Sequence, residues 1–258
     1  MERMLPYAEL VDQALSASFQ GWDFGWLGDR ATSRPLSWSY DDLARAELQR
    51  ATRLLDLDTG GGELLASFAP LPEATIATEG HLPNLPIARD RLGPLGVDVR
   101  MHAGTDPLPV DDDSVDLVLN RHGRLTPSEV ARVLRPGGIL LTQQVGGHND
   151  RGINEALGAP ASAVPPGSPE AGTAEALVRT LVAQGFEMLE VAEEYPEFAF
   201  ADVGALVYHL KAIPWQVPDF DVDKYEPALR ALDQQIRATG PFVVRNHRFR
   251  IRARLQAR

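Results

Sequence analysis

The sequence predicts an α/β fold with a doubly wound, mostly parallel sheet of seven strands. Short apolar runs alternate with helical patterns over about 100 residues, as the crossover units of such a sheet require. One apolar run, LLDLDTGGGELL, ends at three consecutive glycines before a helix begins, and another, ATIATE, ends in an acid. Both features are typical of strands whose carboxyl ends border a ligand site.

Each element follows from its local pattern. Strand patterns cover residues 53–57, 74–79, 97–102, 115–120, 139–145, 186–193 and 242–255. Helical patterns cover residues 41–52, 62–68, 85–92, 127–134, 175–184, 201–212 and 222–238, and the segment 158–172 is too rich in Pro, Gly and Ser to be regular. We find no independent second core in these patterns. The prediction is a cap rich in aromatic residues (1–40), followed by one α/β domain (41–258) with a helical lid insert (196–240).

The composition excludes several classes of function. With 258 residues, of which 44% are hydrophobic, the chain is long enough for a large core. It has no cysteine, which excludes disulfides, cysteine zinc sites and cysteine nucleophiles. Its net charge of −11 disfavours nucleic acid as a partner. Because the sequence shows neither a signal peptide nor a membrane-spanning run, we expect a cytoplasmic protein.

The glycine turn leaves three interpretations open at first. It could be a tight turn without a ligand, a dinucleotide site, or a site for S-adenosylmethionine. A dinucleotide site normally shows G-x-G-x-x-G, which the run D-L-D-T-G-G-G-E does not match. Glu79 lies about 20 residues after the glycines, where an acid accepts ribose hydroxyls in either kind of adenosine site. Glu79 alone does not distinguish a dinucleotide site from an S-adenosylmethionine site.

Four segments taken together resemble the class I S-adenosylmethionine-dependent methyltransferases: LLDLDTGGGELL, ATEGHLPN, DPLPVDDDSVDLVLN and RVLRPGGILL. The resemblance covers roughly residues 40–146. It implies a Rossmann-like fold with an antiparallel last strand, S-adenosylmethionine as cofactor, and methyl transfer as the reaction. The family's loop usually reads D-x-G-x-G-x-G, so Gly60 and Gly62 match its second and third glycines while Asp58 replaces the first. Our hypothesis is that Asp58 is tolerated because the methionine end of the cofactor carries an ammonium.

The resemblance also assigns the cofactor residues. It places the ribose on Glu79, and Gly104 stands where the family often has an acid for the adenine amine. Asn120, Arg121 and His122 follow the fourth strand, where the family meets both cofactor and acceptor. The full predicted set comprises Asp56, Asp58, Thr59, Gly60, Gly61, Gly62, Glu79, Gly80, His81, Gly104, Thr105, Asn120 and Arg121.

The chemistry needs an acceptor atom held in line with the methyl group, and a base when the acceptor is a hydroxyl. His122 is the first candidate for this base because it follows a strand at the ligand edge of the sheet. A structural histidine in a loop is the alternative. His148 is the reserve candidate. We predict no metal site, since 148–150 and 111–113 are interpreted as solvated turns.

Aromatic residues outside the sheet could close the pocket. Trp22, Trp26, Trp38 and Tyr40 precede the first strand, and Trp215 lies in the insert. Packing in an ordinary core is the alternative for all of them. Gln143 and Gln144 end the fifth strand, and because neighbouring side chains point to opposite faces, at least one amide needs a partner there.

The absence of two sequence features narrows the range of possible methyl acceptors. No N-P-P-Tyr or D-P-P-Tyr sequence follows the fourth strand, and cytosine C5 chemistry needs a cysteine. We therefore expect O- or N-methylation of a small molecule, in bacterial specialised metabolism, by a monomer or homodimer. Two alternatives stay open: an rRNA or tRNA base methyltransferase that uses the arginine strand 248–254, and a non-catalytic S-adenosylmethionine-binding protein. We favour a structural role for those arginines, under acidic helices.

Overall fold

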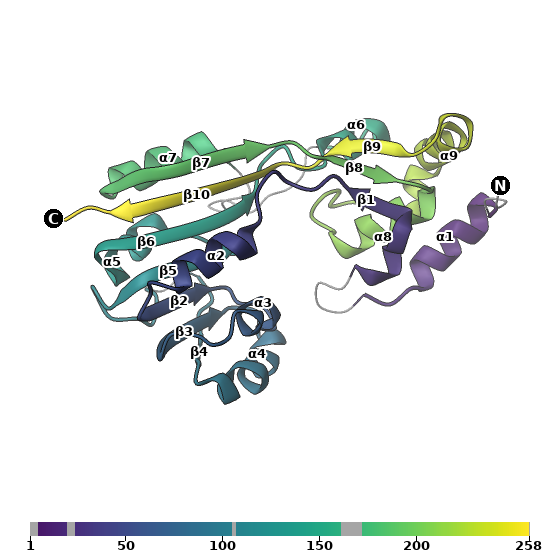
Figure 1. Cartoon of the computed structure of the whole chain (residues 1–258). Helices are drawn as coiled ribbons and strands as arrows, with labels where there is room; N and C mark the ends of the chain where they lie inside the picture. Colours follow the sequence, from purple (N-terminus) through teal and green to yellow (C-terminus); the bar gives the residue numbers. More distant parts are fainter. Residues whose placement is uncertain (1–4, 20–23, 105–106, 161–171, 258) are drawn as a thin grey trace. The chain divides into compact units, whose positions relative to one another are not determined.

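The computed structural model describes residues 5–19, 24–104, 107–160 and 172–257. Its contacts divide the chain into two compact units. The seven-stranded unit comprises residues 37–147, 167–194 and 248–258, and the three-stranded unit comprises residues 1–36, 148–166 and 195–247. The chain therefore passes from one unit to the other several times (Figure 1).

The large sheet confirms the predicted fold class. Its strand order is β4-β3-β2-β5-β6-β10-β7, with β2, β3, β4, β5 and β6 parallel. Only β10, between β6 and β7, runs antiparallel to both neighbours, so the last strand of the chain is antiparallel as expected. The strands are β2 (Arg53–Leu57), β3 (Ala74–Glu79), β4 (Asp98–Met101), β5 (Val115–Arg121), β6 (Leu134–Val145), β7 (Phe186–Glu194) and β10 (Arg248–Leu255).

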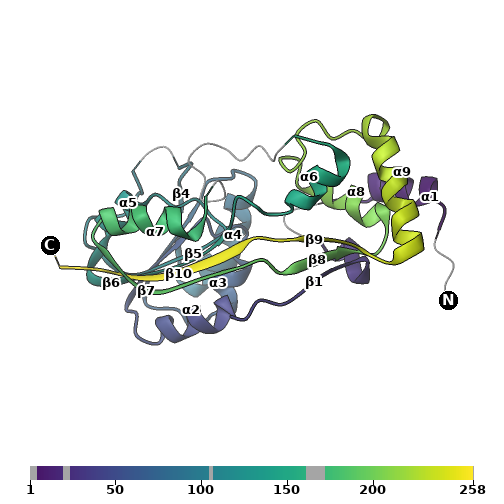
Figure 2. The ribbon, with the colours of Figure 1, turned by 90° about the horizontal axis from the view of Figure 1, so that it is seen from above.

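Helices cover both faces of this sheet because the central strands are apolar on both sides. Leu54 and Leu55 of β2 are both fully buried and belong to two different cores. Leu54 packs in the core of α2, α3 and α4, and Leu55 in the core of α5 and α7; Figure 2 shows α7 and α2 on opposite sides of the sheet. The helices are α2 (Tyr40–Leu48), α3 (Glu63–Ser67), α4 (Asn84–Leu92), the short η2 (Gly93–Leu95), α5 (Pro127–Val133) and α7 (Ala174–Ala183).

The predicted strand 242–255 is two strands in two sheets, which corrects the sequence interpretation. β9 (Phe242–Arg245) pairs with β8 (Glu197–Phe200), whereas β10 starts at Arg248 and pairs with β6 and β7. The predicted strand continues through Asn246 and His247, which lie between β9 and β10 and have buried side chains. Alternation of apolar and polar residues reports a strand but not the sheet that the strand joins.

The arginines of β10 have the structural role that we favoured, although most of their acidic partners differ from those expected. Arg250 donates to Glu190 at 2.8 Å, and Arg254 lies 3.6 Å from Glu187; both acids belong to strand β7 rather than to a helix. Arg252 does reach a helix, where it donates to the buried Glu47 of α2 at 2.7 Å. The opposite face of β10 is apolar and buried. These pairs compensate the charges of Arg250, Arg252 and Arg254.

The three-stranded unit has a core of its own, so the expectation of a single core was wrong. Its antiparallel sheet has the order β1-β8-β9, and α8 is buried on nearly all sides. Leu10, Phe200, Leu206 and Leu229 are among the buried residues of this core. The elements are α1 (Tyr7–Ser16), η1 (Gly25–Arg30), β1 (Ala31–Ser33), α6 (Arg151–Leu157), α8 (Val203–Ala212) and α9 (Val222–Thr239), besides β8 and β9.

The predicted solvated turn at 148–150 is also wrong. Asp150 is only 1% exposed. Its carboxylate accepts a hydrogen bond from the amide of Asn246 and lies 3.2 Å from His209 Nε2. This buried polar cluster belongs to the three-stranded unit. Within the described ranges, no group of three or more His, Cys, Asp or Glu is placed to hold a metal ion.

Asp116 of β5 anchors the start of β2. Its carboxylate accepts hydrogen bonds from the backbone N–H groups of Thr52 and Arg53 at 3.0–3.2 Å and from the Thr52 hydroxyl at 2.6 Å. Arg135 donates to the same carboxylate. The anchor therefore fixes the parallel register of β2 against β5, on which the ends of both strands depend.

We predict that Asp116→Ala lowers the free energy of unfolding by about 1–2 kcal/mol, because two backbone donors lose a charged acceptor. Urea denaturation followed by circular dichroism measures the change. Asp111→Ala is the matched control: its side chain is exposed in the neighbouring loop, so its effect stays within about 0.5 kcal/mol. Equal stability of the two variants would contradict the anchor.

Candidate active site

The parallel strands bring the predicted polar residues to one edge of the sheet. β2, β3 and β5 lie side by side, with Asp56 opposite Ala77 on one side and Leu119 on the other. Glu79 ends β3, and Asn120 lies one residue before the end of β5. Because the strands are parallel, the segments that follow them meet at the same edge. The topology thus gathers residues that are up to about 65 positions apart in the sequence.

The glycine turn needs its glycines for conformation and for space. Gly60 and Gly62 have positive φ angles of 65° and 80°, which glycine adopts without steric cost. A Cβ atom on Gly62 would lie 2.8 Å from Leu92 side-chain atoms. The turn is tied to β3 because Thr59 N–H donates to the Thr78 carbonyl at 2.8 Å. Side chains are thus kept away from the end of β2.

Asp58 occupies a left-handed conformation, with φ of 54°. Aspartate is one of the few non-glycine residues that visit this region readily. Its carboxylate Oδ2 accepts a hydrogen bond from the backbone N–H of Arg124 at 2.6 Å. The aspartate therefore keeps the backbone shape that a glycine would give, and it links the glycine turn to the loop after β5.

Three carboxylates crowd the ends of β2 and β3. Burial, followed by the nearby carboxylates of Asp58 and Glu79, raises the pKa of Asp56 to about 7. Burial also raises the pKa of Glu79, which is 5% exposed, against the lowering effect of a hydrogen bond from His81 N–H. The buried Thr59 hydroxyl lies beside Asp56 and lowers the pKa of that carboxyl in part. Concentrated negative charge at this edge fits a polar ligand with a cationic end.

A cleft opens beside these carboxylates. Its volume is about 220 Å³, and its lining residues are Leu57, Asp58, His102, Gly104, Pro107, Leu108, Arg124, Thr126 and Glu129. A Cβ atom on Gly80 would lie 2.6 Å from the His102 carbonyl, so the loops after β3 and β4 approach closely only because Gly80 has no side chain. Thr105, predicted near the adenine, lies outside the described residues.

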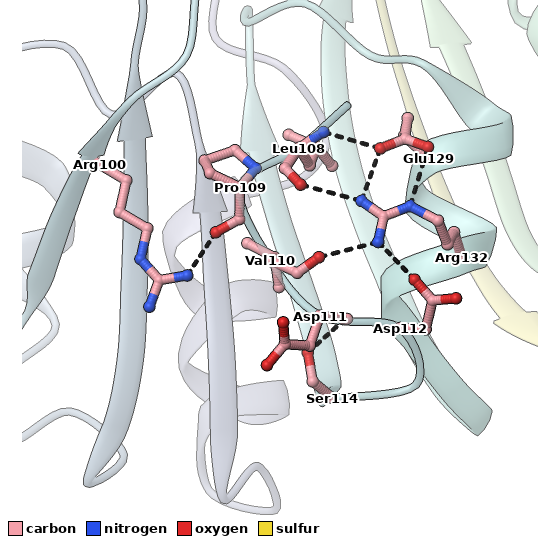
Figure 3. Close-up of polar contacts among 9 residues, drawn as sticks. All are labelled: Arg100, Leu108, Pro109, Val110, Asp111, Asp112, Ser114, Glu129 and Arg132. Atoms are coloured by element: carbon pink, nitrogen blue, oxygen red, sulfur yellow. Dashed lines mark hydrogen bonds and ion pairs between the residues drawn. The ribbon is translucent and has the colours of Figure 1, made fainter. Parts of the chain in front are cut away.

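The wall of the cleft is held by Arg132 of α5 (Figure 3). Its guanidinium donates to the carbonyls of Leu108 and Val110 at 2.9 Å. It also pairs with Glu129 at 2.7 Å and with Asp112 at 2.6 Å. Glu129 in turn accepts the Leu108 N–H at 2.7 Å. A single cation thus fixes the backbone of the loop that carries the predicted solvated acids.

Asn120 is fully buried at the end of β5. Its Oδ1 accepts hydrogen bonds from the Thr142 hydroxyl at 2.9 Å and from the Gln144 amide, and its Nδ2 donates to the Leu57 carbonyl at 3.4 Å. This network ties β5 to β2 and β6. It confirms that Gln144 needs a partner, and it gives Asn120 a structural connection to the glycine turn.

His122 follows Asn120 and also has a left-handed backbone, with φ of 59°. Its Nε2 lies 3.2 Å from Gln143 Nε2, and Trp38 Nε1 donates to Gln143 Oε1 at 2.8 Å. Burial of the ring and the positive charges of Arg248 and Arg121 lower the pKa of His122 to about 3. The imidazole is therefore neutral at neutral pH.

Tyr40 and Arg121 lie in the same unit as His122. Tyr40 begins α2 and is buried. Burial, followed by the Asp56 carboxylate, raises the pKa of its hydroxyl well above the usual value. The Arg121 guanidinium lies 5.9 Å from the centre of its ring. Tyr40 is therefore a neutral phenol beside the carboxylates.

Most of the remaining predicted residues belong to the three-stranded unit. Trp26 stacks on Tyr208 at 4.5 Å in the three-stranded unit. His148 and Trp215 belong to that unit too, and Trp22 lies outside the described residues. A lid role for these four residues stays a prediction. His81 is exposed beside Glu79, to which its backbone donates.

Sequence analysis missed Arg124. Its backbone N–H holds Asp58, and its guanidinium donates to the Ala103 carbonyl across Gly104. The contacts join residues 66 and 21 positions apart, so no local pattern reports them. The one available signal was the segment NRHGR directly after a strand that ends at the ligand edge.

A family model described as "Methyltransferase domain" matches residues 55–142. Those residues include the glycine turn, all three carboxylates and Asn120. The chain carries an S-adenosylmethionine-dependent methyltransferase domain. No curated protein matches the chain. Across the described ranges, no helix combines the length and apolar character that crossing a membrane requires.

Solved structures resemble the whole chain in fold. The YcgJ protein from Bacillus subtilis is 16% identical with a TM-score of 0.57, over 85% of this chain and 99% of that chain. An inferred methyltransferase from Bacillus halodurans is 18% identical with a TM-score of 0.56, over 83% and 99%. The cyclase SpnF is 21% identical with a TM-score of 0.52, over 97% and 93%. These likenesses show the fold alone and leave the acceptor open.

We predict that Asp56→Asn stabilises the cofactor-free protein at pH 8. Between its ordinary pKa of 3.8 and its folded pKa of about 7, the folded state binds the proton more tightly than the unfolded chain. Stability therefore falls as pH rises through this window and stays low above it. Each pKa unit corresponds to about 1.4 kcal/mol; because water still reaches the half-buried carboxylate, we expect a gain of about 1–3 kcal/mol.

The measurement is urea denaturation of both proteins at pH 8 and at pH 5. The gain shrinks at pH 5, where most folded molecules carry a neutral Asp56. Asp90→Asn, an exposed residue on α4, is the control and changes little at either pH. A gain of equal size at both pH values would show that charge on Asp56 is not its cause.

Proposed function

We propose that this methyltransferase transfers the methyl group of S-adenosylmethionine to a hydroxyl or amine of a small-molecule acceptor. In this proposal Asp56, Asp58 and the glycine turn hold the methionine end, and Glu79 accepts the ribose hydroxyls. The cleft lined by Gly104 and Leu108 borders the adenine. The observation that carries the cofactor assignment is the convergence of the glycine turn with Asp56 and Glu79 at one sheet edge.

A small acceptor is favoured over nucleic acid by the arrangement of charge. The net charge is −11. The strongest basic strip of the sequence, on β10, is paired with Glu190, Glu47 and Glu187. A phosphate backbone would have to displace these acids. An RNA methyltransferase would lose activity steeply with added salt, whereas a small-molecule enzyme would not.

The chain's own residues supply binding, orientation and exclusion of water. When bound, the cofactor supplies a methyl carbon made electrophilic by a sulfonium. Asp56 and Asp58 offer negative charge to its cationic end, and the glycine backbone leaves room for close approach. Bringing an acceptor to about 3 Å from that carbon is the main catalytic task, since displacement in a fixed geometry needs little else.

The first test is calorimetric titration with S-adenosylmethionine and, separately, with NADH. We expect about micromolar binding of the first, near −8 kcal/mol, and no binding of NADH. Glu79→Gln should weaken binding about 10- to 100-fold, because a charged acceptor of two ribose hydroxyls is lost. Glu73→Gln, an exposed acid just before β3, serves as control. Tight binding without release of S-adenosylhomocysteine across an acceptor screen would favour the non-catalytic alternative.

Asp58 allows a sharper test of charge against shape. Asp58→Gly keeps the left-handed turn and removes the carboxylate, so we expect about a 3- to 10-fold weaker S-adenosylmethionine affinity. Asp58→Asn tolerates the same φ and still offers Arg124 N–H an oxygen. If Asp58→Asn binds S-adenosylmethionine as weakly as Asp58→Gly does, the negative charge of Asp58 determines the affinity. If Asp58→Asn binds it as tightly as the wild type does, the hydrogen bond to Arg124 N–H determines the affinity. Wild-type affinity in Asp58→Gly would refute the ammonium hypothesis.

A further inference from the structure

Three side chains of the seven-stranded unit form a hydrogen-bonded relay. Trp38 Nε1 donates to Gln143 Oε1 at 2.8 Å, and the other end of that amide, Nε2, lies 3.2 Å from His122 Nε2. An indole N–H can only donate, so the carbonyl end of Gln143 must face Trp38. The amide end then faces His122. Because that end also donates, His122 Nε2 must accept, and the neutral ring carries its proton on Nδ1.

Further contacts fix the positions of the residues in the relay. Gln143 is only 4% exposed, and its backbone carbonyl accepts a hydrogen bond from the backbone N–H of His122 at 2.8 Å. The Arg250 guanidinium lies 5.6 Å from the centre of the Trp38 ring. Reversing the amide would set two N–H groups against each other at Trp38, which leaves a buried donor unsatisfied. The tautomer of His122 is therefore set by a residue 84 positions away in the chain.

This tautomer conflicts with a role as general base. The lone pair of Nε2 is already occupied by Gln143, and Nδ1 carries the proton. Using Nδ1 as the base would require the opposite tautomer, in which Nε2–H opposes the Gln143 N–H. Nδ1 makes no hydrogen bond with the described residues, and the exposed residue leaves its N–H open to a ligand. What His122 offers to a bound molecule is a donor.

Arg121 directly precedes His122 in the chain, and its positive charge acts on the His122 ring. An N–H donor with an arginine as its neighbour favours an oxyanion. A protonated amine would be repelled, and it would need a base that the ring does not provide. Burial raises the pKa of Asp56 to about 7, which would suit a base, but the proposed function commits Asp56 to the cofactor's cationic end.

We propose that His122 donates a hydrogen bond from Nδ1 to the acceptor molecule, and that this acceptor is a carboxylate or acidic phenol already ionised when it binds. Gln143 and Trp38 act through His122 as positioning residues. An oxygen lone pair forms the new O–CH₃ bond, the C–S bond breaks with its electron pair left on sulfur, and no proton has to be removed. The positive sulfonium and the negative oxygen both become neutral. This inference rests on the proposed function for methyl transfer to a small molecule, and it replaces the hydroxyl or amine of that proposal with an oxygen that is already ionised.

Nuclear magnetic resonance of protein labelled with ¹⁵N-histidine tests the relay without cofactor or acceptor. We expect His122 to show a protonated Nδ1 and an unprotonated Nε2. Gln143→Glu should invert the pattern, because a carboxylate accepts from both Trp38 and His122. Trp38→Phe frees the amide to turn and should give a mixture. Trp26→Phe, in the other unit, leaves the signal unchanged. A wild-type ring protonated on Nε2 would overturn the relay.

Two substitutions at His122 separate a donor from a base, since Asn and Asp both tolerate its positive φ. Asn donates but is not basic, whereas Asp accepts and is negatively charged. With an ionised acceptor, His122→Asn should keep kcat within about tenfold of wild type, and His122→Asp should lose about 100-fold or more. The reverse order would establish a base and overturn the donor role, whatever the cofactor titration shows.

An acceptor screen tests the substrate class. Aromatic carboxylates and acidic phenols are offered beside matched alcohols and amines, and release of S-adenosylhomocysteine is measured at one pH. We expect turnover only for the ionised oxygens. Comparable kcat/KM for an alcohol or an amine would overturn the acceptor class while leaving methyl transfer itself established. No S-adenosylmethionine binding at all would instead overturn the proposed function, and the tautomer result would still stand.

Discussion

Repulsion among Asp56, Asp58 and Glu79 is the constraint around which the site is arranged. Three acids at the ends of neighbouring parallel strands cannot all ionise without cost, and burial raises the pKa of each. The protein offsets this with backbone N–H groups from His81 and Arg124. What remains is an edge that a cation would stabilise. The same arrangement makes the cofactor-free domain less stable than its core would allow, as is common where binding groups are concentrated.

The sequence was most informative where function depends on neighbouring residues. The glycine turn, Asp56 and Glu79 were found from local pattern and family resemblance, and five parallel strands lie within a few residues of the predicted ranges. The contacts that organise these residues were not predictable. Asp58 meets the backbone of Arg124, and His122 meets Gln143, only after the strands are placed side by side. A periodic pattern gives an element and its buried face, but it does not give the partners that side chains find at strand ends.

The three-stranded unit escaped prediction for a related reason. β1 and β8 have three and four residues, too few for alternation to be recognised, and they pair with segments about 170 residues apart. Their pairing creates a second core, whose residues looked in the sequence like helical additions to one domain. The prediction that Asp150 lies in a solvated turn failed for the same reason. Its hydrogen-bond partner Asn246 lies between β9 and β10, which the sequence analysis predicted as one strand.

The division of the chain has a consequence for how the gene can be handled. β1, β8 and β9 each lie within a few residues of a point where the chain passes between the units. Neither unit is a contiguous stretch of sequence, so no single cut separates the methyltransferase sheet from its companion. A truncation at either end removes a strand from the small sheet or from the large one. Swapping one contiguous segment with a related protein would therefore cut through one of the two units. Changing the acceptor preference of this chain must proceed by point substitution instead.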